Sequence, residues 1–304
     1  MKNKIILLGI LFIGLFANAQ QEAQYTQYMY NTANVNPAYA GSRESLSVLL
    51  MHRTQWVGLD GAPVTNTFTS HSPLGESKLG LGVSVINDRL GPSEENMVSV
   101  DLSYYIQTAS QFKLAFGVKG TANFLNVDFN KTKIFDPNDG LIRANIDNRF
   151  FPNIGAGVLL YSDKTYFGVS IPYMLEQKYY DNDVQFVASE KMHLHVIGGY
   201  VFDLNDNLKF KPAIKAKAVK GAPLQLDFSA NFLFNEKFTV GGAYRWDAAW
   251  SALAGFQISK SWLIGYAYDK DVTNLGSFNS GSHEIFLRYE LFKSNSKVLA
   301  PRFF

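Results

Sequence analysis

The eleven residues KLGLGVSVIND, at positions 78–88, alternate between large apolar and small or polar side chains. The apolar positions are Leu79, Leu81, Val83 and Val85, and the positions between them are Gly80, Gly82 and Ser84. A period of two indicates an extended strand whose two faces meet different surroundings. An apolar face is suited to hydrocarbon, and a small or polar face is suited to a wet interior.

The same alternation recurs from residue 45 onward, for example in 97–106, 112–119 and 208–217. We expect strands at 45–56, 62–71, 78–88, 96–106, 111–122, 151–161, 164–172, 191–203, 207–219, 223–234, 237–247, 249–258, 261–270 and 281–292. Most have about ten residues, which a tilted strand needs to cross the hydrocarbon layer, whereas soluble strands average 5–6. The predicted fold class is all-β: a closed antiparallel transmembrane β-barrel of about 14 strands, of outer-membrane type.

The connections between these strands support the same architecture. Uniformly short turns at 72–77, 107–110, 162–163, 204–206, 235–236 and 259–260 alternate with a variable set that includes the long segments 123–150 and 173–190. Outer-membrane barrels have short periplasmic turns and longer outer loops, so both termini are expected in the periplasm. The first and last strands must pair, because lipid offers no partner to an open sheet edge.

Aromatic residues fall near the strand ends or on the apolar faces. They are Tyr104, Tyr166, Trp246, Trp250, Trp262, Tyr268 and Tyr289. In a barrel they are candidates for the aromatic girdles at the two membrane surfaces. The alternative is ordinary core aromatics of a soluble β protein, and the strand lengths argue against it.

Residues 1–19 have the pattern of a secretory signal peptide. Lys2 and Lys4 precede the apolar run 5–16, and Ala17-Asn18-Ala19 forms a small-x-small cleavage site. Removing the two lysines leaves 26 basic and 26 acidic residues, so nucleic-acid binding is not expected. The chain has no Cys, which excludes disulfides and thiolate metal sites. No later run of 18 apolar residues predicts a transmembrane helix.

The predicted organisation has four parts. The signal peptide (1–19) precedes a periplasmic N-terminal segment (20–44), the barrel (45–292) and a C-terminal tail (293–304). The segment 20–44 is rich in Gln, Asn, Tyr and Ala and does not follow the barrel pattern. It is a candidate plug of the barrel base or a contact for a periplasmic partner, and the alternative is a disordered leader.

Sites for catalysis are not evident in the sequence. There is neither a nucleophile elbow nor a phosphate-binding glycine loop, so we expect no enzyme activity, catalytic residue or cofactor. His193 and His195 lie two apart on one inward strand face without an obvious third metal ligand. Asp136, Asn138 and Asp139 resemble part of a calcium loop that lacks its terminal Glu. We therefore predict no metal site.

Charged residues are predicted to line the barrel interior. They are Lys209, Lys211, Lys215, Lys217, Asp227, Arg245, Glu284 and Arg288, together with Asp269 and Glu290. One interpretation is an ion-pair network that stiffens the closed barrel, and the other is a lining for a channel or a bound polypeptide. Fourteen strands enclose more space than side chains can fill. Water, the loop 123–150 or the N-terminal segment must therefore occupy the rest.

Several stretches resemble the PorP/SprF family of type IX secretion system membrane proteins. They are QYTQYMYN (24–31), NPAYAGS (36–42), HRTQWVGLDGAPVT (52–65), LGLGV (79–83) with Asn87-Asp88, and SHEI (282–285). The resemblance runs from about residue 21 to residue 292. The N-terminal motifs are specific, whereas the middle strands are typical of barrels in general.

The resemblance implies an outer-membrane protein of Bacteroidota that serves type IX secretion, often beside gliding motility. Implied partners are outer-membrane lipid, a large secreted client with a C-terminal sorting domain, such as a gliding adhesin, and other translocon components. Binding residues carried over from the motifs are Asn36, Pro37, Tyr39, Gly41, Arg53, Gln55, Trp56, Asp60 and Pro63. They form either a lip or loop-packing cluster, or a client contact.

Two functions of different classes remain open at this point. The first is a secretion accessory that binds one client or a translocon partner. The second is an outer-membrane channel or transporter for small or apolar solutes. A neighbouring gene that encodes a large adhesin-like protein ending in a sorting domain favours the first function.

Overall fold

The computed structural model describes residues 24–108, 111–131, 145–178 and 189–291. The predicted signal peptide, the C-terminal tail and the calcium-like residues Asp136, Asn138 and Asp139 lie outside these ranges. No helix among the described residues is long and apolar enough to cross a membrane. The helical elements are α2 (Thr32–Val35) and the 3-10 turns η1 (Pro37–Tyr39), η2 (Phe129–Lys131) and η3 (Asn274–Ser277).

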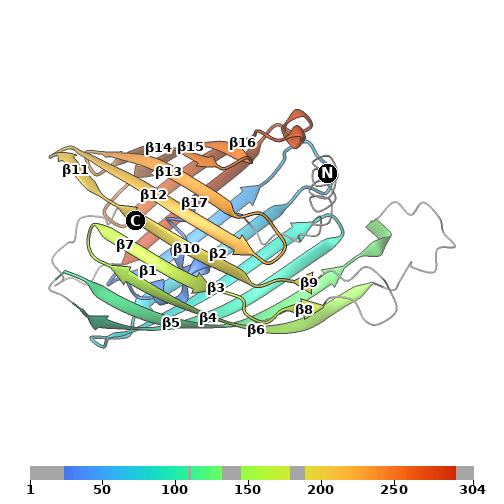
Figure 1. Ribbon diagram of the computed structural model, residues 1–304, viewed down its shortest axis with the longest axis horizontal. Helices are drawn as coiled ribbons and strands as arrows, with labels where there is room; N and C mark the ends of the chain where they lie inside the picture. Colours follow the sequence, from blue (N-terminus) through green and yellow to red (C-terminus); the bar gives the residue numbers. More distant parts are fainter. Residues whose placement is uncertain (1–23, 109–110, 132–144, 179–188, 292–304) are drawn as a thin grey trace, which may run out of the picture.

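Long antiparallel strands form the rest of the molecule (Figure 1). They are β1 (Leu46–Thr54), β2 (Val64–Pro73), β3 (Leu79–Leu90), β4 (Ser93–Gln107), β5 (Lys113–Val127), β6 (Ile146–Tyr161), β7 (Thr165–Ile171), β10 (His193–Tyr200), β11 (Phe202–Asn205), β12 (Leu208–Val219), β13 (Gln225–Phe234), β14 (Phe238–Arg245), β15 (Ala249–Gln257), β16 (Trp262–Asp271) and β17 (Ser282–Leu291). A short hairpin, β8 (Gln177–Lys178) and β9 (Ser189–Glu190), extends from one end.

The strands close into a 14-stranded barrel, in which β10 and β11 together occupy one strand position. Both β10 and β11 pair with β12, on either side of Val201, and together they correspond to the single expected strand 191–203. Strand β1 pairs with β17 from Leu46↔Leu291 to Thr54↔His283, which seals the ring. The predicted closed barrel is therefore confirmed, and the first and last strand ends lie at the same end of it.

Several strands extend beyond their expected bounds. Strands β5 and β6 pair as far as Val127↔Ile146, inside the expected loop 123–150, and β3 and β4 meet at Leu90↔Ser93 inside the expected connection 89–95. The polar residues that suggested loops instead bond across the strands. Asn87 Nδ2, for example, donates to Glu94 Oε1 at 2.7 Å and to Asn96 Oδ1 at 2.8 Å.

The barrel wall follows the alternation that the sequence predicts. On β3 the apolar side chains of residues 79, 81, 83 and 85 are exposed on the outside, while Gly80, Gly82 and Ser84 are buried inside. Apolar side chains exposed in this way have a suitable environment only in lipid. The end with the connections 55–63 and 272–281 is called the loop end below, and the end with the connections 74–78 and 235–237 is called the turn end.

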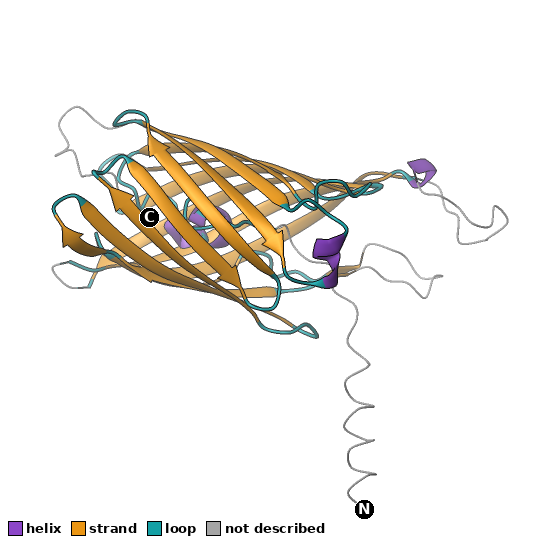
Figure 2. Ribbon diagram, turned by 90° about the horizontal axis from the view of Figure 1, so that it is seen from above, coloured by secondary structure: helices purple, strands orange, loops and turns teal. Residues whose placement is uncertain are grey.

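Residues 24–45 lie within the barrel and form its core. Their short helices, α2 and η1, are visible between the walls in Figure 2. Gln24 bonds to Gln225 at the loop end, and the backbone N–H of Gly41 bonds to His71 near the turn end. The segment therefore runs the length of the lumen, and Gln24 lies at the opposite end from Leu291.

The contact between β16 and the Phe286 side chain of β17 provides a test of the packing inside the barrel. Gly255 and Gly265 are inward-facing register partners on β15 and β16. A Cβ at Gly265 would come well under 3.0 Å from the buried ring of Phe286, whereas one at Gly255 makes contacts of 3.4 Å or more. We expect Gly265→Ala to lower the free energy of unfolding by about 1–3 kcal/mol through overpacking.

Gly255→Ala is the matched control, with an expected change below about 1 kcal/mol. Urea titration of the refolded protein in detergent, followed by heat-modifiable gel mobility, measures both variants. Equal midpoints for the two would contradict the packing of Phe286 against the β16 backbone.

Candidate functional site

The motif NPAYAGS is buried in the lumen from Asn36 to Ala40. Asn36 is fully buried; its side-chain oxygen accepts from the backbone N–H of Ala38 at 3.0 Å, which begins η1. Its Nδ2 donates to the carbonyl of Val158 on β6 at 3.0 Å. Pro37 occupies the first position of η1, where a missing N–H costs nothing. Asn36 thus shapes the turn and attaches it to the barrel wall.

Inward-facing glycines create the space for this motif. A Cβ at Gly117 or Gly157 would come well under 3.0 Å from Ala38 or Asn36 respectively, and one at Gly80 would meet the Ala40 carbonyl. Contacts this close to the wall backbone are possible only where the wall residue is glycine. The glycines on β3, β5 and β6 therefore make these walls concave enough to hold residues 36–40.

At the turn end, polar contacts hold the end of the segment. Ser103 Oγ donates to the Ala40 carbonyl at 2.6 Å, and the ring of Tyr39 lies edge-on to His71 with 5.4 Å between ring centroids. Arg43 forms a two-pronged, buried ion pair with Glu290 of β17. Gly41 has a φ of +74°, which turns the chain from the lumen toward β1.

At the loop end, a buried charge cluster holds the beginning of the segment. Arg53 of β1 donates to Asp269 of β16 at 2.7 Å and to Glu284 of β17 at 3.1 Å. The two carboxylates also accept from the segment: Glu284 from the backbone N–H groups of Thr26 (3.0 Å) and Gln27 (2.8 Å), and Asp269 from the Thr26 hydroxyl (2.5 Å). One guanidinium faces two carboxylates, and the neutral donors of the segment add hydrogen bonds that stabilise the carboxylates.

The inward lysines of β12 lie beside aromatic rings. Lys211 and Lys215 are buried, with their ammonium groups 5.5 Å from the Tyr166 ring centroid and 5.1 Å from that of Tyr28. Tyr166 is thus an interior residue, and its prediction as a girdle aromatic was wrong. Cation–π contact of this kind is favourable where water is excluded. The N-terminal segment therefore supplies, through Tyr28, one of the two rings that these buried cations face.

The other expected lumen charges lie as follows. Lys217 and Arg288 are buried, the latter 5.7 Å from the Tyr30 ring centroid, and Asp227 pairs with Arg245 at 2.7 Å. Lys209 lies at the turn end, half-buried, and pairs with Glu236 at 2.9 Å.

His193 and His195 are buried with 6.3 Å between ring centroids. Within the described ranges, no group of three or more His, Cys, Asp or Glu side chains is placed to hold a metal ion.

The remaining motif residues lie in the first loop. Trp56 has a φ of +47°, and its backbone N–H donates to Ser282 Oγ at 3.2 Å. The next residue, Val57, exchanges backbone hydrogen bonds with Gly281 and Ser280 of the last loop. Gln55 accepts from Arg53 at 3.3 Å, Pro63 is buried, and Asp60 is exposed.

The motif residues therefore divide into two groups. Asn36, Pro37, Tyr39 and Gly41 belong to the lumen segment, and Arg53 binds it. Gln55, Trp56 and Pro63 pack the first loop.

Other residues of this site had no distinct sequence signal. Lys119 and Asp101 form a buried pair at 3.3 Å, with Lys119 also reaching the Ala33 carbonyl at 3.5 Å. Arg43 was missed because it precedes the first strand, where no period marks it. In the sequence, Gly80, Gly117 and Gly157, which make room for residues 36–40, look like ordinary small inward residues. Only their position in one register row across β3 to β6, with Ser103 of β4 between Gly80 and Gly117, distinguishes them, and that requires the register.

The close contact between Gly117 and Ala38 provides a test of how residues 36–40 are held in the lumen. We expect Gly117→Ala to displace them, because the new methyl group would overlap the backbone at Ala38. Gly120→Ala on the same strand faces outward with open space and serves as the control. The chain has no native Cys, so Ala38→Cys can report exposure by maleimide labelling.

Labelling of the thiol introduced at position 38 should be about tenfold faster in the Gly117→Ala background than in the Gly120→Ala background. Equal labelling rates in the two backgrounds would show that the position of residues 36–40 does not depend on Gly117.

The charge cluster gives a second test. Arg53→Met leaves Asp269 and Glu284 buried without their cation, and we expect a loss of about 3–5 kcal/mol in the free energy of unfolding. Arg89→Met removes the exposed pair with Glu94 on the same loop end and should cost less than about 1 kcal/mol. Urea unfolding in detergent compares the two. Similar small losses would show that the cluster does not hold the seam.

Solved outer-membrane proteins resemble this architecture. The CymD monoaromatic hydrocarbon channel matches with a TM-score of 0.50 at 12% identity, covering 88% of this chain and 94% of that one. Acinetobacter baumannii outer membrane protein Omp33 matches with a TM-score of 0.49 at 10% identity, covering 82% and 98%. A Pseudomonas aeruginosa FadL homologue gives 0.47 at 13%, covering 86% and 94%. The first likeness supports the barrel fold alone.

Sequence comparisons are more specific. No curated protein matches the chain. Residues 17–289, nearly the whole chain, match the family model described as type IX secretion system membrane protein PorP/SprF.

Proposed function

Since this chain belongs to the PorP/SprF family of type IX secretion system membrane proteins, we propose that it is a plugged accessory barrel of that system. It is an outer-membrane barrel of the secretion machinery, and its proposed role is to capture one secreted client at its loop end. The client is a large protein with a C-terminal sorting domain, such as a gliding adhesin. Other components of the translocon are proposed as further partners.

The filled lumen is the observation that supports this proposal. Residues 25–40 are almost all buried, and the cavity beside Tyr25, Asn34 and Lys217 holds only about 30 Å³. A barrel filled in this way leaves no room for a folded polypeptide to pass. The solute channel suggested as the alternative requires the segment to leave.

The loop end is the surface proposed for the client. There the hydrogen bonds of Trp56 and Val57 to residues 280–282 join the first and last loops into one platform. On it Phe278 and Val272 are exposed, at 72% and 49%. Exposed aromatic side chains of this kind are enriched among the residues that carry the binding energy of protein interfaces.

The orientation that goes with this proposal places the loop end outside the cell and the turn end in the periplasm. Both ends of the sheet, Leu46 and Leu291, are then periplasmic. In this orientation the N-terminal segment begins with Gln24 at the outer end of the lumen and runs to Leu46 at the periplasmic end. The proposed periplasmic side therefore holds both ends of the sheet, but not Gln24. This orientation follows the asymmetry of outer-membrane barrels, whose longer connections face outward.

A gene deletion tests the proposal. We expect loss of one large surface protein with a C-terminal sorting domain, unchanged uptake of small solutes, and no conductance of the purified barrel in planar bilayers. Surface proteomics, uptake assays and bilayer recording measure the three. Normal secretion together with reduced uptake would favour the solute channel instead.

Complementation locates the surface in the same strain. Phe278→Ser should reduce the amount of client at the surface about tenfold, as for an aromatic at the centre of an interface. Leu204→Ser, an exposed apolar position at the turn end, is the control and should restore secretion. Equal restoration by both variants would remove the loop platform from the proposal.

A further inference from the structure

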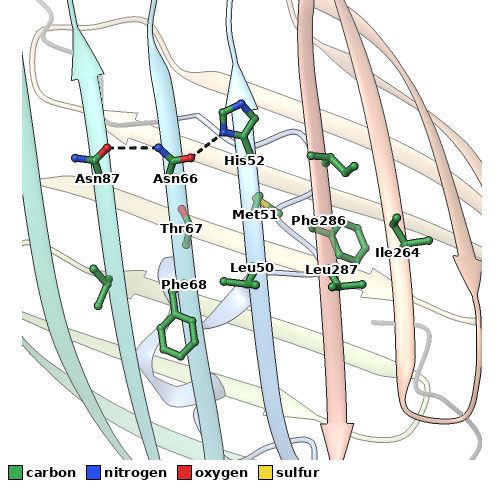
Figure 3. Close-up of a pocket in the computed structure, with 12 residues that line it drawn as sticks. Leu50, Met51, His52, Asn66, Thr67, Phe68, Asn87, Ile264, Phe286 and Leu287 are labelled. Atoms are coloured by element: carbon green, nitrogen blue, oxygen red, sulfur yellow. Dashed lines mark hydrogen bonds between the residues drawn. The ribbon is translucent and has the colours of Figure 1, made fainter.

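The outer wall carries a row of polar side chains that the lumen site does not use. His52, Asn66, Asn87 and Asn96 are register partners on β1, β2, β3 and β4, and all face outward. Hydrogen bonds join them: His52 to Asn66 at 2.8 Å, Asn66 to Asn87 at 3.4 Å, and Asn87 to Asn96 at 2.8 Å (Figure 3 shows the first three residues). This polar row is confined to four strands, because its continuation on β5 and β6 is Phe124 and Phe150.

An apolar row runs parallel to the polar row, two residues nearer the middle of each strand. It consists of Val85, Phe68, Leu50, Leu287 and Ile264 on β3, β2, β1, β17 and β16. Two residues along a strand separate the rows by about 6.6 Å. Between them lies a groove of about 540 Å³ that crosses the closing seam of the barrel (Figure 3).

The two sides of the groove differ in chemistry. The side toward the loop end offers imidazole and carboxamide groups, and the side toward the middle of the membrane offers only hydrocarbon. A molecule that fits must therefore be apolar along its length and must carry hydrogen-bonding groups at the end near the membrane surface. This is the division of polarity within a membrane lipid, and lipid is what the barrel wall already contacts.

We propose that this groove binds one lipid molecule of the leaflet at the loop end. An acyl chain lies between the polar and apolar rows, against Leu50 and Val85. A headgroup oxygen accepts from the Asn66 carboxamide, which has two N–H donors, while its bond to Asn87 uses only one of them. The bound lipid covers the β1–β17 seam from outside, as residues 24–45 cover it from within.

Filling the groove tests the proposal. Val85→Trp places an indole in it, and Val118→Trp places the same side chain on the outward face of β5, away from it. The full mature protein is extracted in mild detergent with native lipid, and bound lipid per barrel is counted by native mass spectrometry. We expect one retained lipid on the wild type and on Val118→Trp, and about tenfold less on Val85→Trp.

A second pair of variants separates headgroup recognition from groove shape. Asn66→Leu removes a polar contact and should also lose the lipid, whereas Ser70→Leu, outward on the same strand, should keep it. Equal lipid counts across all four variants would mean that only unspecific annular lipid is present, and this outcome overturns the proposal. A disulfide-linked dimer formed through Asn66→Cys would place a second copy in the groove, and it overturns the proposal as well.

Discussion

The structure depends on one constraint: a sheet in lipid has no solvent to satisfy the backbone of its edge strands. Pairing of β1 with β17 removes both edges at once. Side chains also join these two strands on both faces of the wall. Arg53 and Glu284 connect the two strands from within, and the outer groove lies across them from outside.

Closing the ring creates a second problem, which is the space inside it. Polar and charged side chains face inward because the strands alternate, yet 14 strands leave a lumen too wide for these side chains to meet across. Residues 24–45 supply the missing donors and rings. The backbone N–H groups of Thr26 and Gln27 donate hydrogen bonds to Glu284. Tyr28 lies against Lys215, and Asn36 donates to the carbonyl of Val158 in the wall. The ion-pair interpretation of the lumen and the plug hypothesis thus describe one arrangement.

The strand count, the face of each strand and the closure of the sheet were predictable because they follow from a period of two over long segments. Strand ends such as Leu90 and Val127 were not, since Asn and Glu side chains that bond across strands look the same in sequence as those in loops. The division of the family motif into Asn36, which is buried in the lumen, and Trp56, which packs a loop, was not predictable either. It depends on contacts between residues more than 100 positions apart.

The path of the N-terminal segment has a consequence for assembly. Its beginning is bonded to β16 and β17, and its end leads directly into β1, so it is held by both partners of the final pairing step. Once the ring is sealed, wall strands enclose the segment on every side. Residues 24–45 are therefore expected to be in place before β17 pairs with β1, so that the barrel closes around them.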